Sequence, residues 1–140
     1  MVDVVNLQRK IKIDTAVFRR YAAELSVSVA DAQGSTFSVA FISDRRMREL
    51  NGFFRNKDST TDVLSFPHEP DEFGDEANLG DIVISVEQAQ RQAKENKLTL
   101  ENEIQQLILH GLLHLCGHDH ETDNGEMNKR ELELRRKLKI

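Results

Sequence analysis

Hydrophobic and polar positions follow two different periods along the chain, and these periods predict a mixed α/β domain. Residues 36–42 alternate strictly, with Phe37, Val39 and Phe41 on one side, which predicts a strand with a buried face. Residues 15–30 instead carry apolar side chains at helical spacing, which predicts a helix. The same criteria predict strands at 2–5, 61–66 and 79–85, and helices at about 44–53, 86–96, 99–117 and 124–138.

The ends of several predicted helices carry capping residues. Ser43, Ser85 and Thr99 stand where a hydroxyl accepts from unpaired N–H groups of a first turn, and Gly117 suits the position after a last turn. The continuous apolar run 82–84 predicts a central strand. We therefore expect an α/β (α+β-like) fold: one small mixed, mostly parallel four-stranded sheet packed with about five helices.

Length and composition place this fold in one domain spanning residues 1–140. The chain has 140 residues, 39% of them hydrophobic, which suffices for a core without metals or disulfides. We find no apolar run of the roughly 20 residues that a membrane span needs and no leader peptide. The single cysteine, Cys116, fits a cytoplasmic protein with no membrane partner.

Charge is distributed unevenly along the sequence. The net charge of −5 argues against a nucleic-acid partner, because phosphate binding needs a basic surface. However, residues 45–57 hold five bases and one acid, whereas residues 69–76 hold five acids and no base. From charge alone, an ordinary solvated helix face explains the basic stretch better than an RNA-binding groove does.

Four of the five histidines fall within residues 110–120. His110 and His114 are four residues apart on a predicted helix, so both imidazoles should leave one face about 5–6 Å apart and meet one ion. Gly117 lets the chain turn, so that His118 or His120 can supply a third ligand; the spacing alone does not decide between them. Three imidazoles would leave a coordination position open, as in catalytic metal sites.

The neighbours of these histidines narrow the chemistry. Cys116 falls on the opposite side of the helix, which favours a small core residue, and His68 is interpreted as a loop residue rather than a ligand. Zinc peptidases place a glutamate directly after the first histidine as general base, and that position is Gly111. Peptide hydrolysis by that route lacks its base, whereas water activation by a metal still suits a phosphodiester.

Three stretches together resemble the YbeY endoribonuclease family of rRNA maturation factors. Residues 110–120, HGLLHLCGHDH, are close to that family's H-G-x-L-H-L-x-G-Y-D-H, and the residues Leu50-Asn51, Arg55, 61–67 (TDVLSFP) and 79–82 (LGDI) also agree. The resemblance spans nearly the whole chain. It implies a metal-dependent endoribonuclease, specific for single strands, that acts in 16S rRNA 3′-end maturation and ribosome quality control, with the ribosomal small subunit and its assembly proteins as partners.

The resemblance also assigns residues. It places the third ligand at His120 and an essential arginine at Arg55, and His118 stands where the family usually has tyrosine. Asp62 and Asp81 match family positions, although hydrogen bonding at strand ends explains both equally well. We thus expect one Zn²⁺ per chain, with other divalent transition metals possible. The expected metal ligands are His110, His114 and His120, and the expected catalytic residues are Arg55 and His110. From the basic stretch 45–57 we expect Arg45, Arg46 and Lys57 to bind RNA.

Arg55 has a chemical rationale of its own, because a planar guanidinium can bind a scissile phosphate bidentately and stabilise its added charge.

Two alternatives to an endoribonuclease remain. One is a metallopeptidase of zincin-like architecture, which Gly111 weakens. The other is a non-catalytic ribosome-assembly module with structural zinc, in which His118 fills the fourth coordination position.

Overall fold

The computed structural model describes residues 3–68, 78–119 and 121–140, which form four strands, five α-helices and one short 3₁₀ helix. In chain order these are β1 (Asp3–Asn6), α1 (Thr15–Ser28), η1 (Ala30–Ala32), β2 (Thr36–Ile42), α2 (Asp44–Arg55), β3 (Val63–Pro67), β4 (Asn78–Ser85), α3 (Val86–Glu95), α4 (Leu100–Leu115) and α5 (Glu126–Leu138). None of these helices is long and apolar enough to cross a membrane.

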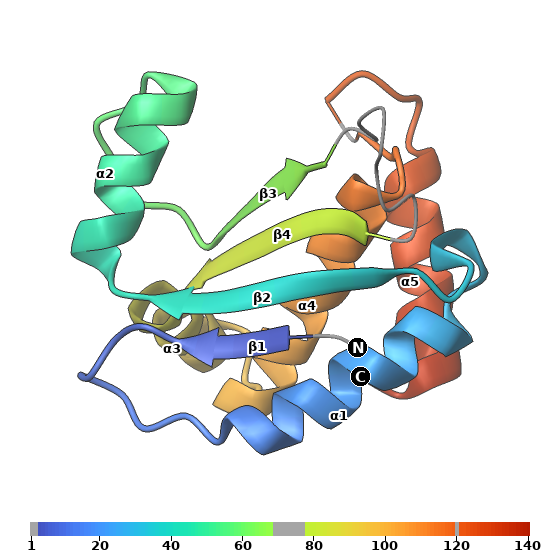
Figure 1. The fold of residues 1–140 in the computed structure, drawn as a ribbon, viewed down its shortest axis with the longest axis horizontal. Helices are drawn as coiled ribbons and strands as arrows, with labels where there is room; N and C mark the ends of the chain where they lie inside the picture. The colour runs from blue at the N-terminus through green and yellow to red at the C-terminus, as the bar shows by residue number, and fades with distance from the viewer. Residues whose placement is uncertain (1–2, 69–77, 120) are drawn as a thin grey trace.

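The strands form one sheet in the order β1-β2-β4-β3 (Figure 1). The pairs β1–β2 and β2–β4 are parallel, and β3 runs antiparallel to β4. The predicted mixed, mostly parallel four-stranded sheet is therefore confirmed, with β4 between two neighbours as its apolar run indicated. Strand β3 is left at one edge, and this edge borders the site described below.

One face of the sheet carries the main core. Phe37, Val39 and Phe41 of β2 are buried on it, as their alternation predicted, together with Ile82 and Ile84 of β4. Helices α1, α3, α4 and α5 lie on this side, behind the sheet in the view of Figure 1. The long apolar stripe of α4 makes it the central helix of this layer.

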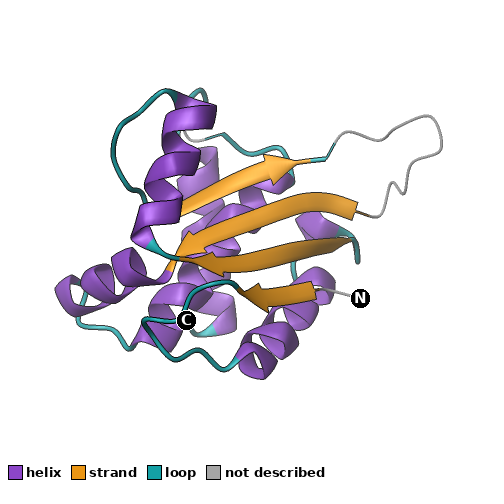
Figure 2. Cartoon of the chain, turned by 60° about the vertical axis from the view of Figure 1, so that its left-hand side comes forward, coloured by secondary structure: helices purple, strands orange, loops and turns teal. Residues whose placement is uncertain are grey.

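The opposite face of the sheet is only partly covered. Helix α2 packs one end of it through a small cluster of Ile42, Met47 and Leu64, and Val83, which packs against that cluster, is only partly buried. Figure 2 shows α2 standing apart from the helices of the main layer. Within the described residues, α2 is the only helix on this second face.

The predicted caps are confirmed. Ser43, Ser85 and Thr99 each accept a hydrogen bond from a backbone N–H of the turn that follows. Gly117 follows the last turn of α4 with a φ of +99°, a conformation that L side chains rarely adopt. The acidic stretch 69–76 lies outside the described residues.

Some predicted boundaries were wrong. Helix α1 ends at Ser28 rather than residue 30, because Val29 is extended and residues 30–32 form a separate 3₁₀ turn. Strand β3 begins at Val63 rather than residue 61, since the Asp62 carboxylate accepts a hydrogen bond from the Val63 N–H. Helix α2 continues to Arg55, where the left-handed Asn56 ends it, so Arg55 is a helical rather than a loop residue.

A single carboxylate ties α2 to the sheet. Asp44 Oδ1 accepts from Ser85 Oγ (2.6 Å) and Thr60 Oγ1 (3.0 Å), and Oδ2 accepts from Arg91 Nη2 (2.5 Å). Burial alone would raise the pKa of the Asp44 carboxyl, but these hydrogen bonds outweigh it and hold the pKa below its usual value. Asp44 thus joins the start of α2 to the end of β4 and to α3.

This network predicts a pH-dependent stability. Asp44→Asn should lower the free energy of unfolding at pH 7 by about 1–2 kcal/mol, since bonds to a charged acceptor are lost. Because the folded pKa is depressed, the stabilisation is present above the unfolded pKa of about 3.9 and disappears as pH falls through the folded value. Urea titrations of both proteins at pH 7 and below pH 3 would measure this.

Asp58→Asn is the matched control for this measurement. The Asp58 carboxylate also pairs with an arginine, Arg48, but its side chain is 87% exposed, so its replacement should change stability little at either pH. An equal effect of the two substitutions would contradict a special role for Asp44.

Candidate functional site

The two histidines of α4 lie side by side at its C-terminal end. Their ring centroids are 5.0 Å apart with an interplanar angle of 70°, in agreement with the spacing predicted for residues four apart on a helix. Both side chains are half-buried rather than packed into the core. The two imidazoles are therefore close enough to share one ion.

His110 is oriented by a carboxylate from another helix. Its Nδ1 lies 2.8 Å from Oε1 of Glu131 on α5, and Glu131 is only 6% exposed. The other oxygen of Glu131 accepts from Arg135 Nη2 at 3.1 Å. A carboxylate accepts hydrogen bonds, so His110 donates from Nδ1, which leaves Nε2 as the nitrogen that could ligate a metal.

Both histidines line a cleft of about 710 Å³ that runs between the end of α2, the edge strand β3 and the end of α4. Arg55 lines the same cleft, 38% exposed at its side chain, with Nη2 3.6 Å from Oε1 of Glu121. The structure thus brings together His110, His114 and Arg55, which were predicted from separate parts of the sequence.

The charges of this cleft favour a cation. Among the residues that the structure describes, three carboxylates line it, those of Asp62, Asp119 and Glu121, against the guanidinium of Arg55. A phosphodiester entering such a cleft meets more negative than positive charge. A divalent ion held by the histidines would neutralise that excess of negative charge, so the donor set and the charge both fit a metal.

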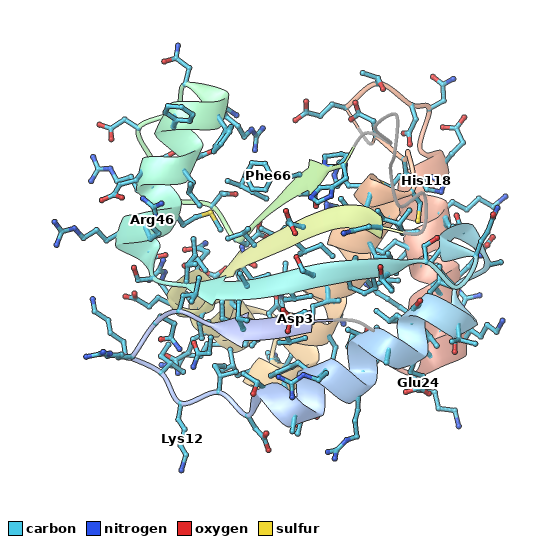
Figure 3. All side chains as sticks on the ribbon, in the orientation of Figure 1. Asp3, Lys12, Glu24, Arg46, Phe66 and His118 are labelled. Atoms are coloured by element: carbon cyan, nitrogen blue, oxygen red, sulfur yellow. The ribbon has the colours of Figure 1, made fainter. Side chains whose placement is uncertain are left out.

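His118 is held by a different part of the fold. His118, labelled in Figure 3, has its Nε2 2.8 Å from Oδ2 of Asp31 in η1. Arg130 of α5 donates to Oδ1 of the same carboxylate. Burial alone would raise the pKa of Asp31, but the hydrogen bonds from Arg130 and His118 outweigh it and lower the pKa. Asp31 thus links His118 and α5 to η1, three segments that are distant in sequence.

The remaining potential ligands are Cys116 and His120. Burial raises the pKa of the partly buried Cys116 thiol to about 11, so it stays protonated at neutral pH and is a poor ligand. His120 lies outside the described residues. Among the residues that the structure does describe, no three His, Cys, Asp or Glu side chains are placed to hold one ion.

Other predicted residues lie away from the histidines. Arg45, Arg46 and Lys57 are exposed and do not line the cleft, and Arg46 pairs with Glu49 at 2.8 Å. Their binding of RNA stays a prediction.

The two aspartates that match family positions form local hydrogen bonds. Asp62 binds the start of β3, as described above, and Asp81 accepts from Ser38 Oγ on the neighbouring strand. His68, interpreted as a loop residue, lies with Nε2 3.2 Å from Oδ2 of Asp81. Asp62 thus makes its hydrogen bond at the start of a strand, whereas Asp81 makes its own within β4.

Gly111 has a steric reason for its identity. A Cβ placed on Gly111 would lie 2.8 Å from Cγ2 of Ile82, a fully buried side chain of β4. The Gly111 carbonyl also accepts from Ser65 Oγ of β3 at 3.3 Å. No side chain fits where a zinc peptidase would carry its glutamate, because α4 lies directly against the sheet here.

Comparison with known proteins identifies the fold first. The solution structure of TM1509 from Thermotoga maritima matches with a TM-score of 0.63 and 27% identity, covering 95% of this chain and 85% of that one. The fold is therefore one already seen in a solved α/β structure.

The family follows from the sequence relatives. A family model described as "Endoribonuclease YbeY" matches residues 3–139. Proteins of that name from Aquifex aeolicus (48% identical, 79% of this chain and 74% of the relative) and Carboxydothermus hydrogenoformans (37%, 95% and 92%) are similar to it. The chain belongs to the endoribonuclease YbeY family, which confirms the resemblance.

Two helical glycines should respond oppositely to alanine. Gly111→Ala forces a methyl group against Ile82 and should cost about 1–3 kcal/mol of stability. In Gly52→Ala the new methyl would lie 3.6 Å from the Lys57 carbonyl oxygen, an ordinary contact. That change should gain about 0.5–1 kcal/mol through helix propensity. Thermal melting would measure both, and equal melting temperatures would contradict close packing at Gly111.

Proposed function

We propose that the protein is a metal-dependent endoribonuclease that cuts single-stranded RNA in the cytoplasm and acts in 16S rRNA 3′-end maturation and ribosome quality control. The observation that carries this proposal is the presence of His110, His114 and Arg55 in one cleft. Membership of the YbeY family supports the reaction class. The small ribosomal subunit and its assembly proteins are the proposed partners.

His110, His114 and His120 are the proposed ligands of one Zn²⁺ per chain, although imidazoles also suit other divalent transition metals. When bound, such an ion lowers the pKa of water and neutralises charge on the phosphodiester. The Glu131 carboxylate supports this assignment because it keeps the proton of His110 on Nδ1. The partnership of His118 with Asp31 favours His120 as the third ligand.

Arg55 is the proposed phosphate-binding residue. Its contact with Glu121 is long, at 3.6 Å, and exposed, so a phosphate can replace that carboxylate at little cost. A guanidinium binds two phosphate oxygens in one plane and can stabilise the charge that develops as water adds. As a ligand, His110 contributes to catalysis through the metal.

The alternatives are less well supported. The packing of Gly111 against Ile82 leaves no room for the general base of a zincin-like metallopeptidase. A structural zinc site needs a fourth protein ligand. His118 would have to leave Asp31 to provide it.

Cleavage assays test the proposal. The zinc-loaded protein should cut a single-stranded RNA but neither a duplex nor casein, and a chelator or His114→Ala should abolish cleavage. Arg55→Ala should lower the cleavage rate by a factor on the order of 10²–10³. Arg55→Lys should also lower the rate by much of this factor, because lysine lacks the planar guanidinium that binds two phosphate oxygens. Metal content and melting temperature should stay near wild type in both Arg55 variants. Casein cleavage, or full RNA cleavage by His114→Ala, would contradict the proposal.

Glu131→Gln should weaken metal binding without unfolding the protein. A neutral amide holds the Nδ1 proton of His110 less firmly, so zinc affinity should fall about tenfold or more in a competition with a chromogenic chelator. Glu133→Gln is the matched control, because Glu133 lies on the same helix with a side chain 51% exposed. Equal zinc affinities in the two variants would argue against an orienting role for Glu131.

A further inference from the structure

Three phenylalanines form a continuous strip on the open side of α2. Phe53 and Phe54 have ring centroids 4.8 Å apart, and Phe54 lies 4.9 Å from Phe66 of β3, both pairs edge to face. Phe53 is 82% exposed and Phe54 is 56% exposed. The side chain of Phe66 extends from β3 toward α2 and is partly buried (Figure 3). Large aromatic side chains exposed together usually mark a binding surface rather than a stabilising one.

The strip adjoins the cleft along strand β3. Ser65 and Pro67 line the cleft, and Phe66 between them faces the opposite side, because successive side chains of a strand alternate. At the other end, Phe54 is followed directly by Arg55, which lines the cleft. A chain molecule bound at Arg55 can therefore continue onto the strip across the edge strand.

Helix α2 and the turn after it carry charges of both signs, and two of the cations are not paired with an acid among the described residues. Arg45 and Lys57, both exposed, lie near the two ends of α2 and form no ion pair within the part of the chain that is described. The ligand that suits exposed aromatic rings beside unpaired cations has flat apolar faces and a negatively charged backbone. Single-stranded nucleic acid has both, whereas a duplex hides its base faces inside the stack.

We propose that Phe53, Phe54 and Phe66 form a base-stacking platform for the single-stranded RNA that enters the cleft. This inference rests on the proposed function and adds to it a source of preference for single strands. The platform holds unpaired bases by stacking without reading their sequence, while Arg55 binds the phosphate. Phe53 is the outermost ring and the one best placed to take a base.

Three variants separate stacking from other contributions. Phe53→Leu keeps an apolar side chain but removes the ring, and Phe53→Tyr keeps the ring. Val27→Ala, at a residue 81% exposed on α1, is the control for loss of exposed apolar surface elsewhere. Each zinc-loaded full-length protein would be assayed for KM and kcat on a short fluorescent single-stranded RNA, with an abasic sugar-phosphate strand as competitive inhibitor.

Stacking predicts a specific pattern. Phe53→Leu should raise KM about fivefold or more with kcat within about twofold, whereas Phe53→Tyr and Val27→Ala should match wild type. The inhibition constant of the abasic strand should not change in any variant, because that strand has no bases to stack. Circular dichroism would verify that all variants are folded.

The possible failures are distinct. A wild-type KM in Phe53→Leu, or an equal loss of abasic-strand binding, would overturn the platform while leaving the endoribonuclease assignment intact. A wild-type protein that cuts no RNA would overturn both the proposed function and the platform that rests on it.

Discussion

The contact between Gly111 and Ile82 sets the position of α4, and the site depends on it. Because Gly111 has no side chain and packs directly on the Ile82 side chain of β4, the last turns of α4 pass close to β3. His110 and His114 therefore emerge beside the edge of the sheet rather than inside the core. A bulkier residue at position 111 would push both imidazoles away from Arg55, which lines the same cleft from the C-terminal end of α2.

The local parts of this arrangement could be predicted from the sequence. Caps at Ser43, Ser85 and Thr99, alternation in β2 and the four-residue spacing of His110 and His114 all depend on neighbours within one or two turns. The errors at the ends of α1 and β3 came from backbone conformations that the hydrophobic pattern does not encode.

Contacts between distant segments could not be predicted in this way. The residues around Glu131 in the sequence do not indicate that it contacts His110. The charged pattern of its helix indicates only an amphipathic surface. Likewise, nothing in the sequence places Asp31 of η1 beside His118. The phenylalanine strip also combines residues from a helix and a strand, and a histidine pattern directs attention away from it.

The attachment of α2 has a mechanical consequence. Asp44 fixes the first turn of this 12-residue helix, and Arg55 is its last residue, roughly 16 Å away at about 1.5 Å of rise per residue. A tilt of about 5° at the fixed end would move the guanidinium by roughly 1.4 Å, and misplacements of about 1 Å can cost on the order of 100-fold in rate. Ser85 and Arg91, which bind Asp44 at the first turn of α2, therefore influence the position of Arg55 although neither residue lines the cleft.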